Sequence, residues 1–348
     1  MIFKRCANVI QRWRKLGLAL ALFASHPLLA IPEDELELRE NELAAFYKQG
    51  TSGYFIGVNQ VPTYYHSFIH PEEKLKLVIL TGRTESTEKY DELAYDLYQR
   101  SYSVYLFDWP GHGKSGRYLE DTHKCHITDY QDYLHALEQF MDQMVAPQGQ
   151  EQLVPIAAFA HSMGANVLSL YTIKHPQKFD RLILSSPMLD IPTPINQKAL
   201  WYFLRFAEWI GFGDAYVYTH GPYDPNEENH VTSSVARYQR QIRWRVANPQ
   251  KNLGGATIAW ARASLEATWE MRSHAEQMTT PILLLQAGKD IVVKVDGQDY
   301  VCSQAADCQK VYFADAKHEI LQESDSIRDR ALEAILEFLE PVQGSPLP

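Results

Sequence analysis

The stretch Val154-Pro-Ile-Ala-Ala-Phe-Ala-His-Ser-Met-Gly-Ala-Asn-Val-Leu-Ser-Leu-Tyr-Thr-Ile-Lys174 decides how this chain is expected to fold. Its first part, Val154–Phe159, is a short apolar run typical of a buried strand, and its last part, Ala165–Lys174, has a helical pattern. Between them, Ala160-His-Ser-Met-Gly164 sets a serine among small residues. A tight strand-to-helix turn of this kind holds a serine hydroxyl exposed and strained. We predict that Ser162 is a nucleophile rather than an ordinary helix-capping serine.

Short apolar runs alternate with helical segments on both sides of this turn. The other expected strands are Leu75–Leu80, Val104–Phe107, Leu182–Leu184, Ile282–Gln286 and Val311–Phe313. The other expected helices are Tyr90–Gln99, Tyr130–Met144 and Ser326–Leu339. This alternation predicts an α/β fold with a mostly parallel sheet flanked by helices. Ahead of it we expect a helix within Glu33–Tyr47 and an antiparallel pair within Tyr54–Phe68, broken at Pro62.

One segment, from about Pro192 to His274, interrupts the alternation. It has no strand pattern and is rich in Trp, Tyr, Phe and Arg. An insertion at this point lies over the carboxyl edge of the sheet, where open α/β folds bind their ligands. We therefore expect residues 31–191 and 276–348 to form the core and residues 192–275 to form a helical cap or lid.

A serine nucleophile needs a base, and the base needs an acid that orients it. After a turn of this type the chain order is serine, then the acid, then histidine, with the last two on loops after late strands. His318 follows the last expected strand, and Asp290 follows the one before it. We predict His318 as the base and Asp290 as the acid. Asp190 is the rival acid, whereas Asp315 lies too close to His318 in sequence.

Acyl transfer also needs hydrogen-bond donors for the developing oxyanion. One is expected to be the backbone N–H of Met163, at the start of the helix after the nucleophile. The second is expected from the loop Thr81–Ser86, where Gly82 permits a close turn and the N–H of Arg83 is the candidate donor. The alternative for Arg83 is a plain strand-to-helix turn.

A second short motif, Gly113-Lys114-Ser115, matches the end of a nucleotide-binding phosphate loop. The full motif needs a glycine where this chain has Asp108, and Pro110 removes one of the cradling N–H groups. We interpret the segment as a structural turn that supports the catalytic loops.

Composition excludes several classes of protein. The 348 residues carry 33 basic and 43 acidic side chains, a formal charge of −10 that argues against non-specific nucleic-acid binding. Four cysteines show no spacing typical of a zinc site. Cys302 and Cys308 are six residues apart, so they form either a disulfide or two unrelated thiols.

The first thirty residues differ from the rest of the chain. A basic block precedes an apolar stretch, Leu16–Ala30, of about fifteen residues, whereas a membrane-spanning helix needs about twenty. This order is typical of a secretory signal peptide, although Leu28 makes the cleavage site after Ala30 imperfect. We expect export to the periplasm or outside a bacterial cell. The alternatives are an uncleaved anchor in the inner membrane and a tail without function.

Several motifs together resemble the bacterial lysophospholipase L2 and monoacylglycerol lipase family. They are Arg39-Glu-Asn, Thr81-Gly-Arg-Thr-Glu-Ser, Lys89-Tyr-Asp-Glu-Leu-Ala, Asp108-x-x-Gly-x-Gly-x-Ser, Ala160-His-Ser-Met-Gly, Trp260-Ala-Arg and His318-Glu-Ile-Leu. The resemblance implies an α/β-hydrolase fold and hydrolysis of an ester with a single acyl chain, without a cofactor. Two departures stand out. Thr81 replaces a histidine common in monoacylglycerol lipases, which favours the lysophospholipase branch, and Ala160 replaces a glycine.

The expected cap offers two groups of candidate substrate contacts. Trp201, Phe206 and Trp209 supply apolar surface for an acyl tunnel or a membrane-facing patch, or they simply pack the cap onto the sheet. Four arginines, Arg237, Arg240, Arg243 and Arg245, either meet a phosphate or form a solvated helix face, and we favour the second interpretation.

These observations predict a serine carboxylic ester hydrolase, foremost a lysophospholipase, acting on a small lipid ester. A monoacylglycerol lipase or general carboxylesterase uses identical chemistry and is the alternative. A more remote alternative is a non-catalytic lipid-binding protein with a hydrolase-like fold. The cap is a candidate for peripheral contact with a membrane surface, and no protein partner or nucleic acid is implied.

Overall fold

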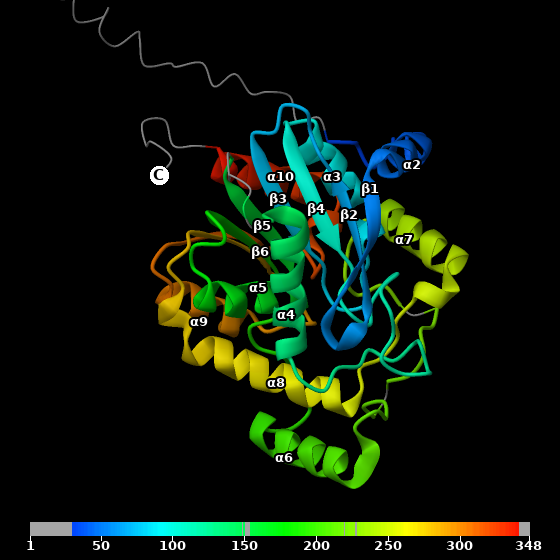
Figure 1. Cartoon of the computed structure of the whole chain (residues 1–348), viewed down its shortest axis with the longest axis vertical. Helices are drawn as coiled ribbons and strands as arrows, with labels where there is room; N and C mark the ends of the chain where they lie inside the picture. Colours follow the sequence, from blue (N-terminus) through cyan, green and yellow to red (C-terminus); the bar gives the residue numbers. More distant parts are fainter. Residues whose placement is uncertain (1–29, 148, 150–153, 219, 227, 341–348) are drawn as a thin grey trace, which may run out of the picture.

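Eight strands of the described chain form one mixed sheet with helices on both faces (Figure 1). The structure is a computed structural model that describes residues 30–147, 149, 154–218, 220–226 and 228–340. In space the strands follow the order β1-β2-β4-β3-β5-β6-β7-β8. Their bounds are β1 (Thr51–Ile56), β2 (Pro62–Phe68), β3 (Leu75–Leu80), β4 (Tyr102–Phe107), β5 (Ile156–His161), β6 (Arg181–Ser185), β7 (Ile282–Ala287) and β8 (Cys308–Phe313).

The sheet is antiparallel only where it begins. β1 pairs antiparallel with β2, and β2 pairs antiparallel with β4, whereas all later pairings are parallel. The expected break at Pro62 is displaced, because Pro62 is the first residue of β2, a position where a strand tolerates proline. The chain turns instead at residues 57–61, where Asn59 and Gln60 have positive φ angles of 55° and 62°.

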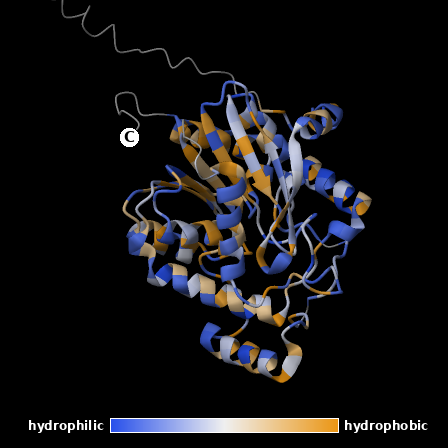
Figure 2. Cartoon of the chain, in the orientation of Figure 1, coloured by the Kyte–Doolittle hydropathy of each residue, from blue (hydrophilic) through white to orange (hydrophobic). Residues whose placement is uncertain are grey.

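Helices cover the two faces of the sheet and bury a core on each. α4 (Gln131–Phe140) and α5 (Met163–Lys174) cover one face, and α3 (Asp91–Tyr98) and α10 (Asp325–Leu339) cover the other. Figure 2 shows the central strands as predominantly apolar, which is typical of parallel strands buried on both faces. The expected α/β architecture is therefore confirmed.

The N-terminal helix α2 (Glu40–Gln49) begins later than the expected Glu33, because residues 33–39 form turns. The predicted leader lies outside the described residues, apart from Ala30. Within the part of the chain that is described, no helix is both long enough and apolar enough to cross a bilayer.

The segment of residues 192–275 contains three α-helices in its described part: α6 (Gln197–Ala207), α7 (Val235–Ala247) and α8 (Ile258–Ser273). α6 lies on the outer side of α8, and α7 lies apart from both, beside α2 (Figure 1). The segment adds no strand to the sheet, as expected, but its helices do not stay together. Its role as a cap remains a prediction.

Two arginines of α7 are not solvated, although the sequence pattern favoured a solvated helix face. Arg237 is buried and pairs with Glu92 of α3 at 3.0 Å, while Arg240 pairs with Asp91. A buried guanidinium needs such a carboxylate, since an unpaired buried charge is strongly unfavourable. The expectation of a solvated face is therefore wrong for Arg237 and Arg240. These two residues attach α7 to α3.

Cys302 and Cys308 form a disulfide that joins the end of α9 (Val295–Gln304) to the start of β8. Replacing both cysteines by serine is expected to lower the free energy of unfolding by about 2 kcal/mol, because the cross-link restricts the unfolded chain. Urea unfolding with and without a reductant measures this difference. An unchanged midpoint after complete reduction would contradict the prediction.

Candidate active site

Ser162 lies between β5 and α5 in a backbone conformation that L-residues rarely adopt. Its φ is 51° and its ψ is −114°. The backbone holds it there, because its N–H donates to Ser185 O at 3.1 Å and its carbonyl accepts from Met188 N–H at 3.0 Å. A strained residue costs of order 1–3 kcal/mol and persists only where its surroundings fix it. The strand-to-helix turn therefore has the geometry expected around a nucleophilic serine.

Gly164 and Gly82 let two loops meet beside Ser162. A side chain at Gly164 would place its Cβ 2.5 Å from the carbonyl oxygen of Thr81, so only glycine fits there. A Cβ at Gly82 would lie 2.9 Å from Nδ1 of His161. At Ala160, by contrast, a methyl group is accommodated inside β5, where the residue is fully buried. The alanine in place of the usual glycine therefore does not disturb the turn.

His318 and Asp290 meet although 28 residues separate them in sequence. Nδ1 of His318 lies 2.7 Å from Oδ2 of Asp290. The other carboxylate oxygen of Asp290 accepts N–H groups of Val292 and Val293 at 2.8 and 3.1 Å. These bonds fix the carboxylate, which in turn fixes the imidazole with its Nε2 free to act as a base.

The rival acids are engaged elsewhere. Asp190 lies 2.6 Å from Arg272 and also accepts a hydrogen bond from Gln197. Asp315 is exposed and pairs with Lys289 at 2.7 Å. Neither side chain contacts an imidazole in the described structure. Asp290 is therefore the candidate acid that the geometry favours.

The imidazole of His318 lies beside the serine turn. Its ring is 4.7 Å, between centroids, from the ring of His161, the residue before Ser162. Nε2 of His161 lies 3.3 Å from the carbonyl oxygen of His318. No hydrogen bond joins the Ser162 hydroxyl to another residue in the described part of the chain. Such contacts are often loose before substrate binds and tighten in the reacting complex.

The two candidate oxyanion donors flank the same turn. Met163 is the first residue of α5, and its N–H has no partner among the described residues. The same holds for the backbone N–H of Arg83, whose guanidinium donates to Gly254 O at 3.1 Å and lies over the ring of Trp260. Free amide N–H groups at this place are suited to donate hydrogen bonds to a negatively charged oxygen. Their role remains a prediction.

A buried charge network behind the oxyanion loop was not anticipated. Glu85 accepts hydrogen bonds from Gly82 N–H and from the Tyr90 hydroxyl, and it lies 3.1 Å from Nδ1 of His161. Lys89 lies 2.5 Å from Glu85 and 2.6 Å from Glu319, the residue after His318. The network thus joins the oxyanion loop, the serine turn and the base loop. The motif residues Glu85 and Lys89 were visible in the sequence, but their partners in the other two loops, His161 and Glu319, are more than 70 residues away.

Charge balance keeps this network ionised. Burial favours the neutral acid, but Lys89 and His161 outweigh it and hold the pKa of Glu85 well below its ordinary value. Burial likewise opposes ionisation of Glu319, and Lys89 again lowers its pKa. The positive charge of Lys89 therefore stabilises two buried carboxylates, those of Glu85 and Glu319.

Replacing Lys89 by methionine is expected to lower the free energy of unfolding by about 3–5 kcal/mol, because two buried carboxylates lose their cation. Urea unfolding measures the change. Lys310→Met is the matched control, since Lys310 pairs with Asp299 at the surface and an exposed pair contributes less than about 1 kcal/mol. Equal losses in the two variants would contradict the importance of the network.

The pH dependence of hydrolysis is expected to follow His318. Burial lowers the pKa of His318, and this effect exceeds the opposite effect of its hydrogen bond to Asp290. Because the base must be neutral to accept the serine proton, kcat/KM rises as pH increases through this pKa. The half-maximal pH should lie below about 6.5, the ordinary value for histidine. A pH–rate profile measures it, and an acidic limb centred above that value would contradict the assignment.

The Gly113-Lys114-Ser115 segment wraps around a buried carboxylate rather than a phosphate site. Asp108 accepts the N–H groups of Thr87 and Lys114, both at 2.7 Å. A Cβ at Gly113 would collide with the Asp108 carboxylate at 2.2 Å. This arrangement agrees with a structural turn, which ties the segment to the residues that follow the oxyanion loop.

The cap aromatics occupy two different environments. Trp201 is half-buried, and its Nε1 donates to Glu266 of α8 at 2.6 Å. Phe206 and Trp209 are 56% and 79% exposed. With Tyr202 and Arg262 they border a shallow surface depression. The structure therefore does not bring Phe206 and Trp209 into a closed tunnel, and their contact with substrate stays a prediction.

Comparisons with known proteins agree with this geometry. Residues 71–325 match the family described as serine aminopeptidase, S33. The chain is 33% identical over 324 residues to lysophospholipase L2 of Escherichia coli strain K12, covering 88% of this chain and 94% of that protein. The chain belongs to the S33 family. A second relative is the monoacylglycerol lipase of Mycolicibacterium smegmatis, 22% identical over 274 residues, or 78% of this chain and 91% of that protein.

Solved structures place the S33 chain in the α/β-hydrolase fold. A soluble variant of monoglyceride lipase from Saccharomyces cerevisiae, in complex with a substrate analogue, matches with a TM-score of 0.65 and 16% identity, over 83% of this chain and 95% of that one. Monoacylglycerol lipase of Paleococcus ferrophilus matches with a TM-score of 0.62 and 21% identity, over 80% of this chain and 98% of that one. The predicted fold and family resemblance are confirmed, and the chain is a serine hydrolase. Among the described residues, no group of His, Cys, Asp and Glu side chains is arranged to hold a metal ion.

Proposed function

We propose that this chain hydrolyses carboxylic esters of lipids with a single acyl chain, foremost lysophospholipids, and releases a fatty acid. The observation that carries the proposal is the strained Ser162 turn beside the His318–Asp290 pair. The lysophospholipid substrate is supported by the 33% identity to a protein named lysophospholipase L2. No resident cofactor takes part in the proposed chemistry.

The proposed reaction is a two-step acyl transfer. Oγ of Ser162 bonds to the ester carbonyl carbon while its proton passes to Nε2 of His318, and the carbonyl electron pair becomes an oxyanion. The bond to the leaving alcohol then breaks, and His318 returns the proton to that alcohol. Water repeats the sequence on the acyl-enzyme, so the fatty acid leaves and Ser162 regains its proton.

Two backbone amides are proposed to stabilise the oxyanion, those of Met163 and Arg83. Removing one such donor typically costs about 10²–10³ in kcat, so the position of the Arg83 loop matters for the rate. The Glu85 network is proposed to hold that loop in place.

A substrate panel tests the proposed function. The panel contains lysophosphatidylcholine, a monoacylglycerol, a short nitrophenyl ester and a peptide amide, each offered to wild-type chain and to Ser162→Ala. We expect the highest kcat/KM on the lysophospholipid. Preference for monoacylglycerol would favour the lipase alternative, turnover of the short ester alone would favour a general carboxylesterase, and no turnover of any substrate would favour a non-catalytic lipid-binding protein.

We also propose that α6 contacts the membrane surface that carries the substrate. Tyr202, Phe203 and Phe206 of α6, and Trp209 in the helical turn that follows it, are each more than half exposed, whereas Leu204 and Ala207 are buried. Aromatic side chains on the outer face of such a helix are suited to the boundary between water and acyl chains. Sedimentation with phosphatidylglycerol vesicles tests this, with Phe206→Ser/Trp209→Ser expected to lose binding and unchanged sedimentation arguing against it.

Export is proposed on two grounds: the leader pattern in residues 1–30 and the disulfide, which persists in oxidising compartments. Cell fractionation with N-terminal sequencing tests both export and cleavage after Ala30. Recovery of the chain in the cytosol with its leader would contradict the proposal.

A further inference from the structure

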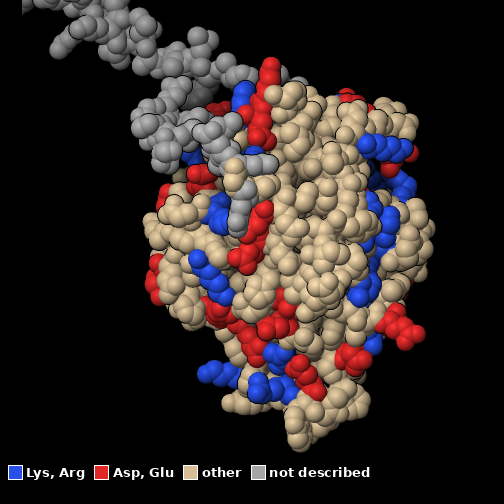
Figure 3. All heavy atoms as spheres, viewed as in Figure 1, with Lys and Arg blue, Asp and Glu red and all other residues tan. Residues whose placement is uncertain are grey.

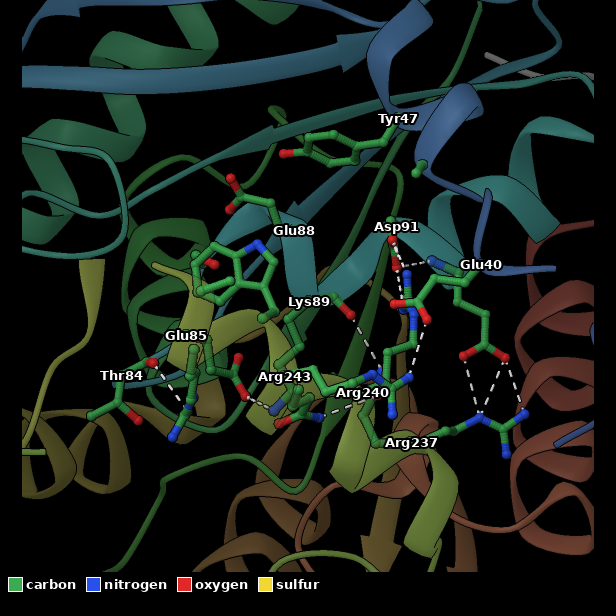
Figure 4. A pocket seen from close by; sticks show the side chains of 18 of the residues that line it. Glu40, Tyr47, Thr84, Glu85, Glu88, Lys89, Asp91, Arg237, Arg240 and Arg243 are labelled. Atoms are coloured by element: carbon green, nitrogen blue, oxygen red, sulfur yellow. Dashed lines mark hydrogen bonds and ion pairs between the residues drawn. The ribbon is translucent and has the colours of Figure 1, made fainter. Parts of the chain in front are cut away.

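A cavity of about 560 Å³ lies between α2, α7 and the residues that follow the oxyanion loop (Figure 4). Neither Ser162 nor His318 lines it, so it is not the site of the proposed reaction. Thr84 and Glu85 do line it, and they come directly after the candidate donor Arg83. The cavity and the oxyanion loop thus share a wall. Its volume is within the range of small-molecule sites.

Each carboxylate that lines this cavity pairs with a cation, and two of these cations are shared with carboxylates outside it, Lys89 with Glu319 and Arg237 with Asp325. Glu85 pairs with Lys89, Glu88 with Lys114, Asp91 with Arg240, Glu92 with Arg237, and Glu40 with Arg243. Two lining cations are left over, since no carboxylate of the described chain pairs with Lys48 or Arg245. Lys and Arg side chains gather along this edge of the molecule in Figure 3. The cavity therefore has residual positive charge in a protein of negative net charge.

The uncharged lining residues divide evenly between polar side chains, which are Thr84, Ser86, Gln241 and Gln322, and apolar ones. Ala44 and Tyr47 of α2 face the cavity from one side, and Trp244 and Ala247 of α7 face it from the other. Apolar walls with cations among them are complementary to an acyl chain with an anionic head.

The shared wall contains a strained residue. Thr84 has a φ of 65°, which is unusual for a β-branched side chain. Its carbonyl accepts only a long hydrogen bond, 3.4 Å, from Nη2 of Arg245. A carboxylate binds a guanidinium more strongly than a neutral carbonyl does. An anion in the cavity would therefore draw Arg245 away from Thr84 and leave the strained residue without this support.

We propose that this cavity binds a free fatty acid, the product of the proposed reaction, and that its occupancy slows turnover through Thr84 and the Arg83 loop. Lys48 and Arg245 bind the carboxylate, and the acyl chain lies against Tyr47 and Trp244. The inference rests on the proposed function for its ligand, but the site itself is separate from the active site. It gives the enzyme feedback inhibition by its own product.

Inhibition kinetics with a short nitrophenyl ester test the regulation. Palmitate below its micelle concentration should lower kcat of the wild type by about 5-fold or more, with little change in KM. Lys48→Glu/Trp244→Ala should keep the basal kcat and lose the inhibition. Lys174→Glu, which changes an exposed lysine on α5, is the matched control and should remain inhibited. Inhibition through KM alone, or inhibition that persists in the double variant, would overturn the proposal.

Direct binding separates this site from the proposed function. Titration calorimetry measures how many palmitate molecules bind to Ser162→Ala and to the variant Ser162→Ala/Lys48→Glu/Trp244→Ala. We expect one more binding site in Ser162→Ala, and this difference does not depend on whether the wild type hydrolyses any ester. An uncharged alkylglycerol should not occupy the additional site. Equal stoichiometry in the two proteins, or equal binding of the uncharged lipid at that site, would overturn the proposal while leaving the hydrolase assignment intact.

Discussion

Ser162→Ala is expected to lower kcat for ester hydrolysis by about 10⁴- to 10⁶-fold, because no acyl-enzyme forms without the hydroxyl. Alanine fits the site sterically, so the variant should fold normally. Steady-state kinetics on the best substrate of the panel, checked by burst analysis, measures the loss. Circular dichroism confirms that the comparison is made between folded proteins.

Ser169→Ala is the matched control for this variant. Ser169 lies on α5, the helix that follows Ser162, is buried, and donates its hydroxyl hydrogen to the carbonyl of Ala165 at 2.7 Å. Its replacement should leave kcat within a few-fold of wild type. Near-normal hydrolysis by Ser162→Ala, or equal losses in the two variants, would contradict the role of Ser162.

Asp290→Asn is expected to lower kcat by about 10⁴-fold, the loss known when an orienting carboxylate of a serine triad becomes an amide. The amide no longer accepts the Nδ1–H of His318, so the imidazole loses its tautomer and its orientation. The acidic limb of the pH profile should also move to lower pH, because the Asp290 carboxylate raises the pKa of His318. Kinetics from pH 4 to 9 measures both effects.

Asp190→Asn distinguishes this assignment from its rival. Asp190 lies 2.6 Å from Arg272 and 3.8 Å from Lys294, so its loss should reduce stability and leave the chemistry intact. A large loss of kcat in Asp190→Asn, with Asp290→Asn near wild type, would transfer the role of acid to Asp190.

Periodicity in the sequence predicted the sheet well because the central parallel strands, β3 to β7, are buried on both faces. Such strands are short apolar runs bounded by polar residues, as Leu75–Leu80 is. The limits of other strands shifted by one to three residues. β8 begins at Cys308 rather than Val311, because this edge strand carries polar residues that hide it from a search for apolar runs.

Local motifs identified the candidate site residues, but not what holds them. Ser162, Asp290 and His318 each follow a strand, so parallel topology alone brings them to one edge. The partners of Lys89 could not be predicted, since Glu319 lies 230 residues further along the chain. A charged residue in a loop shows no periodicity that would reveal burial.

The helices of residues 192–275 were the least predictable part. The sequence pattern of α7 predicted that its arginines are solvated. Arg237 and Arg240 are paired instead, because their carboxylate partners, Glu92 and Asp91, belong to α3. Their burial depends on where α7 docks, which no local pattern specifies. The exposed aromatics of α6 show the opposite case, in which an apolar pattern does not mean burial.

Labelling with a fluorophosphonate, followed by peptide mass spectrometry, tests the central claim most directly. The reagent reacts only with a serine that a neighbouring base activates, so it reports the convergence of Ser162, His318 and Asp290 in solution. We predict a single phosphonylated residue, Ser162, with labelling slowed in His318→Ala and absent in Ser162→Ala. A chain that stays unlabelled, or carries the label on another serine, would contradict the account.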